Sequence, residues 1–269
     1  MDRTTVESTA RRAANNEHLD RLARVGLVVY GILHLLIGVI AIQLAWGGGG
    51  QADQSGAMST LADNPAGQAI LWAGAVGFAA LTVWWLVAAL VGARGADGSR
   101  QVGEMGKGFG KAVLFAALGY LSVRFAVGSG GGQSEESATA TVLGLPGGRF
   151  IVGIGGVIVI AIGCYHVYKG LTRSFRDDLR RDAADGTSGT AIMTLGTVGY
   201  PAKGVAIVLV GVLFVVAAIR HDPDEAGGLD EALKTLQEQP FGPWVLTVIA
   251  VGIAAFGIYC FGRARYQHS

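Results

Sequence analysis

Three ionisable side chains stand inside apolar stretches of this sequence, where a charge or a titrating ring is costly. His34 lies in the run Val25–Trp46, Arg124 lies near the end of Ala112–Val127, and His166 lies near the end of Phe150–Tyr168. An ionisable group inside a membrane-spanning helix must find a partner or face a water-filled cavity. Each of the three is therefore a candidate ligand-binding or pathway residue.

Two of these residues leave two interpretations open. His34 is either a neutral imidazole hydrogen-bonded to a neighbouring helix, or a group that works on a ligand, a proton or a metal. Arg124 either reaches lipid phosphates or a structural partner, or it forms an anion site inside the helix bundle. Residue type alone does not decide between these roles.

His166 has a different setting, beside Tyr165, Tyr168 and Lys169. Aromatic and basic residues in such a group are typical of the belt at a membrane surface. The alternative is a bis-histidine haem site shared with His34, which needs the two helices to face each other.

Motifs of soluble enzymes do not occur in the sequence. There is no HExxH, CxxC or Gly-x-Ser-x-Gly, and the glycine runs lack the Gly-Lys-Ser/Thr of a phosphate-binding loop. No apolar run contains a carboxylate, which argues against a pump with an intramembrane Asp or Glu relay. We therefore expect no catalytic residues, no metal and no cofactor.

Composition places the chain in a membrane. Of its 269 residues, 51% are hydrophobic and 15% charged, and the apolar residues gather in six runs that reach spanning length with their flanks. The formal net charge of +1 gives no reason to expect nucleic-acid binding. These features predict an all-α polytopic protein of six transmembrane helices.

The six runs form three copies of one pattern. Small residues recur seven positions apart, about two helical turns, on one face of the first helix of each copy: Gly31 and Gly38, Ala112 and Gly119, Gly204 and Gly211. The second helix of each copy follows a Pro-x-Gly at Pro65, Pro146 and Pro240. The matched spacing predicts three tandem two-helix repeats over 21–94, 104–173 and 194–265. The small residues would pack helices closely, or alternatively line a pathway.

Basic residues set the expected topology. Seventeen of the 21 Lys and Arg residues flank one side, in the N-terminal tail, the 93–111 and 169–203 loops and the C-terminus. That side is predicted to be cytoplasmic, with both termini there, a cytoplasmic tail at 1–20 and a cytoplasmic linker at 174–193. The repeats are then parallel, which suggests a pseudo-threefold bundle.

The motif of the third copy resembles a known family. Gly199-Tyr-x-Ala-x-Gly204, Gly211 and Leu236-x-x-x-Pro240-x-Gly242 are similar to the bacterial membrane family called domain of unknown function 1206. The second copy departs from the pattern, with Ala112 for a glycine and Val142-Leu143 before Pro146. The resemblance covers residues 21–265, and it implies three two-helix copies in a bacterial plasma membrane but no activity.

Our functional expectation is a non-enzymatic membrane module that binds or scaffolds a lipid or protein partner. Its partners would be the lipid bilayer, with a membrane protein or a second copy of the chain as further possibilities. The alternative is a small transporter or channel with a pathway at the repeat interface, lined by His34 and Arg124. A haem or redox subunit is the weaker alternative.

Overall fold

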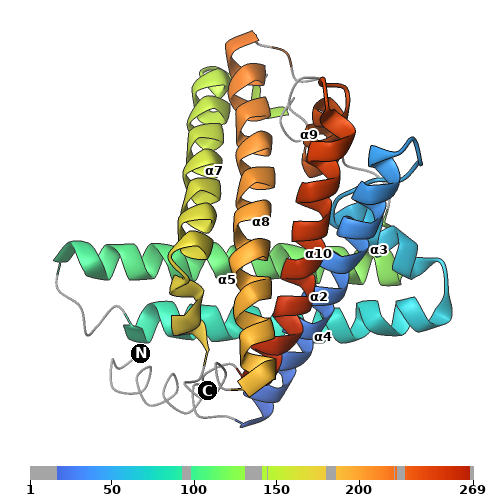
Figure 1. Cartoon of the computed structure of the whole chain (residues 1–269). Coiled ribbons are helices and arrows are strands. Elements are labelled where there is room, and N and C mark those ends of the chain that lie inside the picture. The colour runs from blue at the N-terminus through green and yellow to red at the C-terminus, as the bar shows by residue number, and fades with distance from the viewer. Residues whose placement is uncertain are drawn as a thin grey trace. The chain divides into compact units, whose positions relative to one another are not determined.

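The structure is a computed structural model that describes residues 17–92, 98–130, 141–143, 145–179, 186–220, 222 and 228–266. These residues are almost entirely helical. In chain order the helices are α2 (Glu17–Ala45), α3 (Gln54–Ala62), α4 (Pro65–Gly92), α5 (Gly98–Ala126), α7 (Gly148–Leu171), the 3-10 helix η2 (Ser174–Asp178), α8 (Gly186–Arg220), α9 (Leu229–Gln237) and α10 (Gly242–Tyr266) (Figure 1). The first sixteen residues of the predicted tail lie outside the described residues.

Six helices in the described part of the chain are long and apolar enough to cross a membrane. They are Glu17–Ala45, Pro65–Ala89, Met105–Ala126, Gly148–Leu171, Gly189–Arg220 and Gly242–Tyr266. This confirms the predicted all-α fold with six candidate transmembrane helices. The fifth of them begins upstream of the apolar run from Val205, because α8 extends back to Gly186.

The chain forms two compact units. The first contains α4, α5 and the first part of α2, and the second contains the remainder of α2 with α7, α8, α9 and α10. Within the first unit α4 and α5 lie side by side, and within the second unit α8 packs against both α7 and α10 (Figure 1).

Glycines bring α7 and α8 into backbone contact. A Cβ atom on Gly204 would lie 2.6 Å from the carbonyl oxygen of Gly163, and one on Gly211 would lie 2.8 Å from the carbonyl oxygen of Gly156. Apart from Lys169, every buried residue of α7 is a glycine. Helix packing in lipid depends on close van der Waals contact, so this face packs inward while Ile and Val side chains face outward.

The same register recurs between α10 and α2. A Cβ atom on Gly31 would lie 2.7 Å from the carbonyl oxygen of Gly257, and one on Gly38 would lie 2.9 Å from that of Ala250. Gly257 follows Pro240 by 17 residues, the interval that separates Gly163 from Pro146. Repeat 3 therefore contacts repeat 1 through the positions by which repeat 2 contacts repeat 3.

The first unit contains the third example, between α4 and α5. Gly119 faces Phe78 and the carbonyl oxygen of Ala75, and Ala112 is buried at 2% exposure. Ala75 follows Pro65 by ten residues, as Ala250 follows Pro240. In all three interfaces the second helix of one repeat packs on the first helix of the next, with repeat 3 followed by repeat 1.

The structure gives a physical reason for the Leu-x-x-x-Pro-x-Gly pattern. In each repeat the glycine lies so close to the carbonyl group six residues earlier that a Cβ atom would collide with it; the pairs are Gly67 with Leu61, Gly148 with Val142, and Gly242 with Leu236. Pro65 begins α4, whereas Pro146 and Pro240 stand two residues before α7 and α10, so the missing N–H of each proline breaks no helical hydrogen bond. Any side chain at the glycine of this pattern would collide with that carbonyl group. The pattern therefore reflects a tight backbone turn at the start of the second helix.

Candidate functional site

His34 is buried in the second unit and faces a lysine. Its side chain is 3% exposed, and its Nε2 atom lies 3.1 Å from Nζ of Lys203 on α8. With Nζ as an ammonium donor, Nε2 is the acceptor and the imidazole is the neutral Nδ1–H tautomer. The ring of Phe256 on α10 lies 5.0 Å from the imidazole and 4.3 Å from Nζ. Three helices thus meet at one polar pair.

Lys203 belongs inside a helix because α8 continues through a proline. Pro201 removes one backbone hydrogen bond, which normally ends or kinks a helix. Here its ring packs against Gly170 of α7 at a distance that leaves no room for a Cβ atom. Lys203 therefore stands 17 residues, about 25 Å of helix, before Arg220 at the other end of α8.

The equivalent pair in the first unit is aromatic. Tyr30 and Phe115 occupy the repeat positions of Lys203 and His34, and their ring centroids lie 5.6 Å apart in an edge-to-face contact. The fold therefore accepts two aromatic rings at this contact. The Lys203–His34 pair differs in chemistry from this counterpart, although Lys111 holds the position of Lys203 in repeat 2.

Four aromatic rings pack together beside this pair, those of Tyr200, Phe256, Tyr259 and Phe175. Tyr200 is 3% exposed, and its ring lies 5.1 Å from Phe256, 5.4 Å from Tyr259 and 5.3 Å from Phe175. Phe175 is fully buried and comes from η2, the short helix that follows α7. A Cβ atom on Gly196 would collide with the Phe175 ring at 2.5 Å, so glycine at this position lets η2 approach α8.

Two further basic residues lie beside the rings. Nζ of Lys169 is 2.6 Å from Oδ2 of Asp178 and 5.4 Å from the Tyr200 ring. Arg263 of α10 has a fully buried Nε atom without a hydrogen-bond partner among the described residues, and its electrostatic neighbours include Tyr200 and Asp178. We call His34, Lys169, Lys203 and Arg263, with the four rings, the basic–aromatic cluster.

His166, the second candidate histidine, borders this cluster. Its Nδ1 lies 2.8 Å from the carbonyl oxygen of Ile162, so Nδ1–H donates within α7. Its ring stacks on Tyr200 at 6.0 Å and meets Tyr165 edge-on. His34 and His166 thus contact different members of the cluster, Phe256 and Tyr200.

Arg124, the third candidate, belongs to the first unit. Its Nη2 atom donates to the carbonyl oxygen of Ser129, 2.7 Å away, and its guanidinium lies 5.9 Å from the Tyr120 ring. Gly128 adopts φ +75°, and the backbone N–H of Ser129 bonds the carbonyl of Arg124 at 2.8 Å. The arginine therefore closes the turn that ends α5, as a C-terminal cation commonly does.

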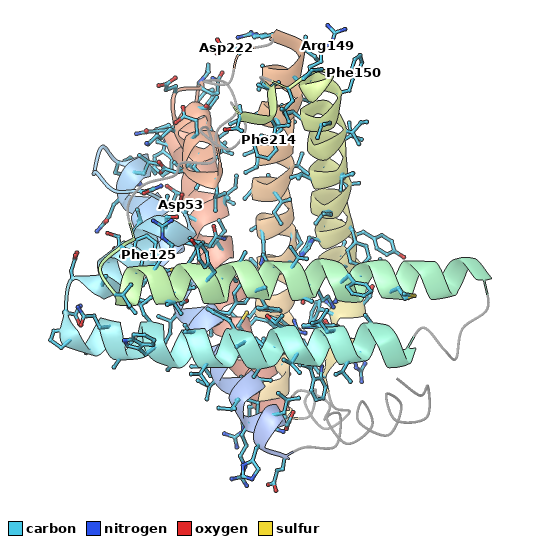
Figure 2. The ribbon with its side chains drawn as sticks, turned by 180° about the vertical axis from the view of Figure 1, so that it is seen from behind. Asp53, Phe125, Arg149, Phe150, Phe214 and Asp222 are labelled. Atoms are coloured by element: carbon cyan, nitrogen blue, oxygen red, sulfur yellow. The ribbon has the colours of Figure 1, made fainter. Side chains whose placement is uncertain are left out.

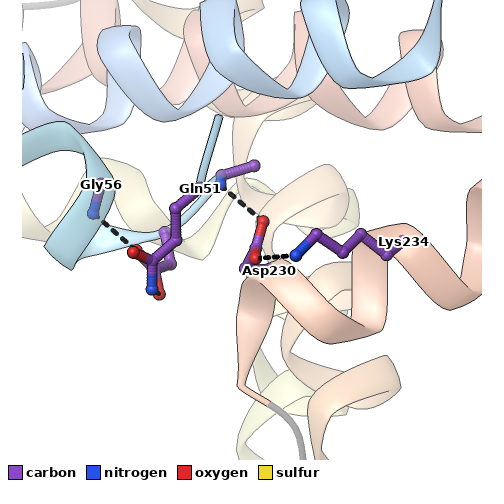
Figure 3. A network of polar contacts seen from close by, with 6 residues as sticks. Gln51, Gly56, Asp230 and Lys234 are labelled. Carbon is purple, nitrogen blue, oxygen red and sulfur yellow. Dashed lines mark hydrogen bonds and ion pairs between the residues drawn. The ribbon is translucent and has the colours of Figure 1, made fainter. Parts of the chain in front are cut away.

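A second polar network joins the loop after α2 to α9 (Figure 3). Asp230 accepts the backbone N–H of Ala52 at 2.7 Å and pairs with Lys234 at 2.7 Å. Asp53 accepts the backbone N–H of Gly56 at 2.8 Å, which caps α3, and the amide of Gln51 at 2.9 Å. Burial raises the pKa of the Asp53 carboxyl, and the nearby charge of Asp230 raises it further.

Lys203 is the principal residue that sequence reasoning missed. It was counted with the other basic residues of the 169–203 loop, whereas α8 begins upstream and includes it. One signal was available: Lys203 precedes Gly204 by one position, as Tyr30 precedes Gly31, and Tyr30 lies within an apolar run. Phe175 and Asp178, in the short segment after α7, carried no periodicity that could have indicated them.

The fold and the cluster define a class of protein, a polytopic helical membrane protein built from three two-helix repeats. Comparison with known proteins gives the family. Residues 25–92, 107–173 and 198–267 match the family described as Domain of Unknown Function (DUF1206), and the chain belongs to it. An uncharacterised protein of Bacillus subtilis (strain 168), YxxB, is 28% identical over 252 residues, which are 93% of this chain and 92% of that protein. No solved structure matches the chain.

Proposed function

We propose that this protein is a non-enzymatic integral membrane protein of the bacterial plasma membrane that binds an anionic lipid at the basic–aromatic cluster. One observation carries the proposal: in the basic–aromatic cluster the described cations Lys169, Lys203 and Arg263 outnumber the carboxylate of Asp178, and the buried Nε atom of Arg263 has no hydrogen-bond partner among the described residues. A buried group of cations that outnumbers its carboxylate attracts further negative charge. A phosphate head group supplies that charge, and its acyl chains suit the apolar helix faces.

The position of the cluster along the helices fits a head group. Lys169 is in the last turn of α7, and Arg263 is in the last turn of α10. We propose that this end is cytoplasmic, as the excess of basic residues on this side favours. Anionic lipids of the cytoplasmic leaflet attract basic residues at that depth. Arginine adds a planar fork of donors that matches phosphate oxygens.

The test is lipid-dependent stability. Purified protein in mild detergent is titrated with phosphatidylglycerol or phosphatidylcholine, and the thermal midpoint is recorded. A ligand at about 100 times its Kd stabilises the folded state by about 2.7 kcal/mol, so phosphatidylglycerol should raise the midpoint by several degrees. Arg263→Gln and Lys203→Gln should lose most of this rise. An equal response to both lipids would overturn the proposal.

A matched control comes from the opposite end of α7. Arg149 is exposed and lies beside Phe150, with a guanidinium-to-ring distance of 4.8 Å (Figure 2). Arg149→Gln removes the same charge at a site outside the cluster. It should keep the full response to phosphatidylglycerol. Loss of the response in this variant as well would show that only net charge matters.

Transport remains a second candidate because the Lys203–His34 pair places two titratable groups inside spanning helices. A pathway needs water at His34, whereas the described contacts surround it with Lys203, Phe256 and a glycine-packed helix interface. Protein in liposomes with an internal pH dye and an imposed potassium gradient measures proton flux. Flux that disappears in His34→Phe would favour transport over lipid binding.

A further inference from the structure

A short strap covers the basic–aromatic cluster at the end of α7. The strap comprises residues 172–179, with η2 at its centre and Arg173 in the left-handed region at φ 56°. Its anchor is Phe175, which stacks on Tyr200 at 5.3 Å and meets Tyr259 edge-on at 5.4 Å. Among the described contacts, the carboxylate of Asp178 in the strap pairs with Lys169 of the cluster at 2.6 Å.

Asp178 places its negative charge among the cations of the cluster. It pairs with Lys169, and it is also an electrostatic neighbour of Arg263 and of the Tyr200 and Tyr259 hydroxyl groups. Its side chain retains 22% exposure, so the ion pair is partly open to solvent. The preceding residue along the chain, Asp177, is exposed and carries an identical charge.

We propose that Asp178 stands in for the anionic group of the ligand, so that a phosphate-bearing head group competes with it for Lys169 and Arg263. This inference rests on the proposed function and adds regulation to it. In the closed form the carboxylate satisfies the cations and Phe175 fills the space between the rings. In the bound form the phosphate takes over the cations, the Lys169–Asp178 pair breaks, and the strap lifts.

The construction of the strap suits such an exchange. A 3-10 helix has poor hydrogen-bond geometry and is stable only in short pieces. The strap is therefore held by a side-chain anchor and an ion pair more than by its own backbone. An ion pair that is partly open to solvent contributes little net stability. Replacing one anion by another consequently needs only a modest difference in affinity.

Neutralising Asp178 gives the sharpest test. Asp178→Asn keeps the size of the side chain and removes the competing charge, whereas Asp177→Asn removes an equal charge that the cluster does not use. Native mass spectrometry and titration of the full chain in detergent give the Kd for phosphatidylglycerol. Asp178→Asn should bind this lipid tighter by on the order of tenfold, because the competent state is no longer suppressed. Asp177→Asn should equal the wild type.

A measurement on the wild type needs no variant. Hydrogen exchange of residues 172–179 should accelerate in phosphatidylglycerol nanodiscs relative to phosphatidylcholine nanodiscs. Inorganic phosphate added to the detergent sample separates the two sources of the anion. If inorganic phosphate alone accelerates exchange in the strap, the competitor of Asp178 is a free anion. That result supports the proposed competition and contradicts the proposed lipid ligand.

The failures are distinguishable. If the wild type prefers phosphatidylglycerol but Asp178→Asn binds it no tighter, and strap exchange is unchanged, the competition is wrong and the lipid-binding function stands. If neither the wild type nor Asp178→Asn distinguishes the two lipids, and phosphate has no effect, both proposals fall. If Asp178→Asn prefers phosphatidylglycerol over phosphatidylcholine and the wild type does not, the strap blocks the lipid site in the wild type.

Discussion

Lys203 Nζ lies 3.1 Å from His34 Nε2, and this contact joins the first helix of repeat 3 to the first helix of repeat 1. The corresponding contact between repeats 1 and 2 is the aromatic pair Tyr30–Phe115. One repeat architecture therefore carries two different chemistries at the same position.

The pair can be exchanged for its aromatic counterpart. His34→Phe alone takes the hydrogen-bond acceptor from Lys203, which should cost about 1–3 kcal/mol of unfolding free energy. The double variant His34→Phe with Lys203→Tyr reproduces the Tyr30–Phe115 contact and should recover most of that loss. Thermal unfolding in detergent measures both variants. A double variant less stable than His34→Phe would contradict the equivalence of the two contacts.

Adjacent glycines on α7 test the packing interface. Gly156→Ala places a Cβ atom 2.9 Å from the carbonyl oxygen of Gly211 and should destabilise by about 1–3 kcal/mol through overpacking. Gly155→Ala is the control, since a methyl group there would have no atom within 4 Å, and it should be neutral or stabilising by at most about 1 kcal/mol. Equal midpoints for the two variants would rule out the close α7–α8 contact.

Much of the architecture was predictable because it repeats. Spacing between small residues and prolines indicated three two-helix units, and hydropathy indicated six spans, since both signals lie within single segments. The basic–aromatic cluster was harder to predict from the sequence. Lys203 was counted with the 169–203 loop, whereas α8 runs through Pro201, whose ring packs against Gly170. Likewise, the pairing of His34 with Lys203 is a tertiary contact over 169 positions, and a polar strap such as 172–179 has no periodicity to reveal it.

The turn before α10 contains a residue in a costly conformation. Phe241 adopts φ +61°, where glycine is favoured, and its side chain is 80% exposed. Gly147 holds the same position in repeat 2 at φ +80°. Phe241→Gly should therefore stabilise the turn by about 1 kcal/mol. Gly242→Ala, whose Cβ atom would collide with the carbonyl of Leu236, should lower the thermal midpoint instead.

Asp53 should give the loop network a pH-dependent stability. Burial raises its pKa above 3.8, so the folded state binds a proton more readily than the unfolded state. Its contribution to stability therefore falls as pH rises from 3.8 through the raised pKa. Asp53→Asn keeps an oxygen for the Gly56 N–H and carries no charge. The free energy of unfolding of Asp53→Asn relative to the wild type should accordingly be higher at about pH 7 than at about pH 4.

Thermal midpoints of both proteins across this pH range measure the effect. Asp53→Ala serves as the control, because it removes the charge and also the cap of α3, a loss of about 1 kcal/mol. Asp230 and Lys234 are present in all three proteins, so their interaction with each other cancels to first order. If Asp53→Asn loses stability relative to the wild type as pH rises, the carboxylate is favoured in the fold. The hydrogen bonds from the Gly56 N–H and the Gln51 amide would then stabilise the Asp53 carboxylate by more than burial destabilises it.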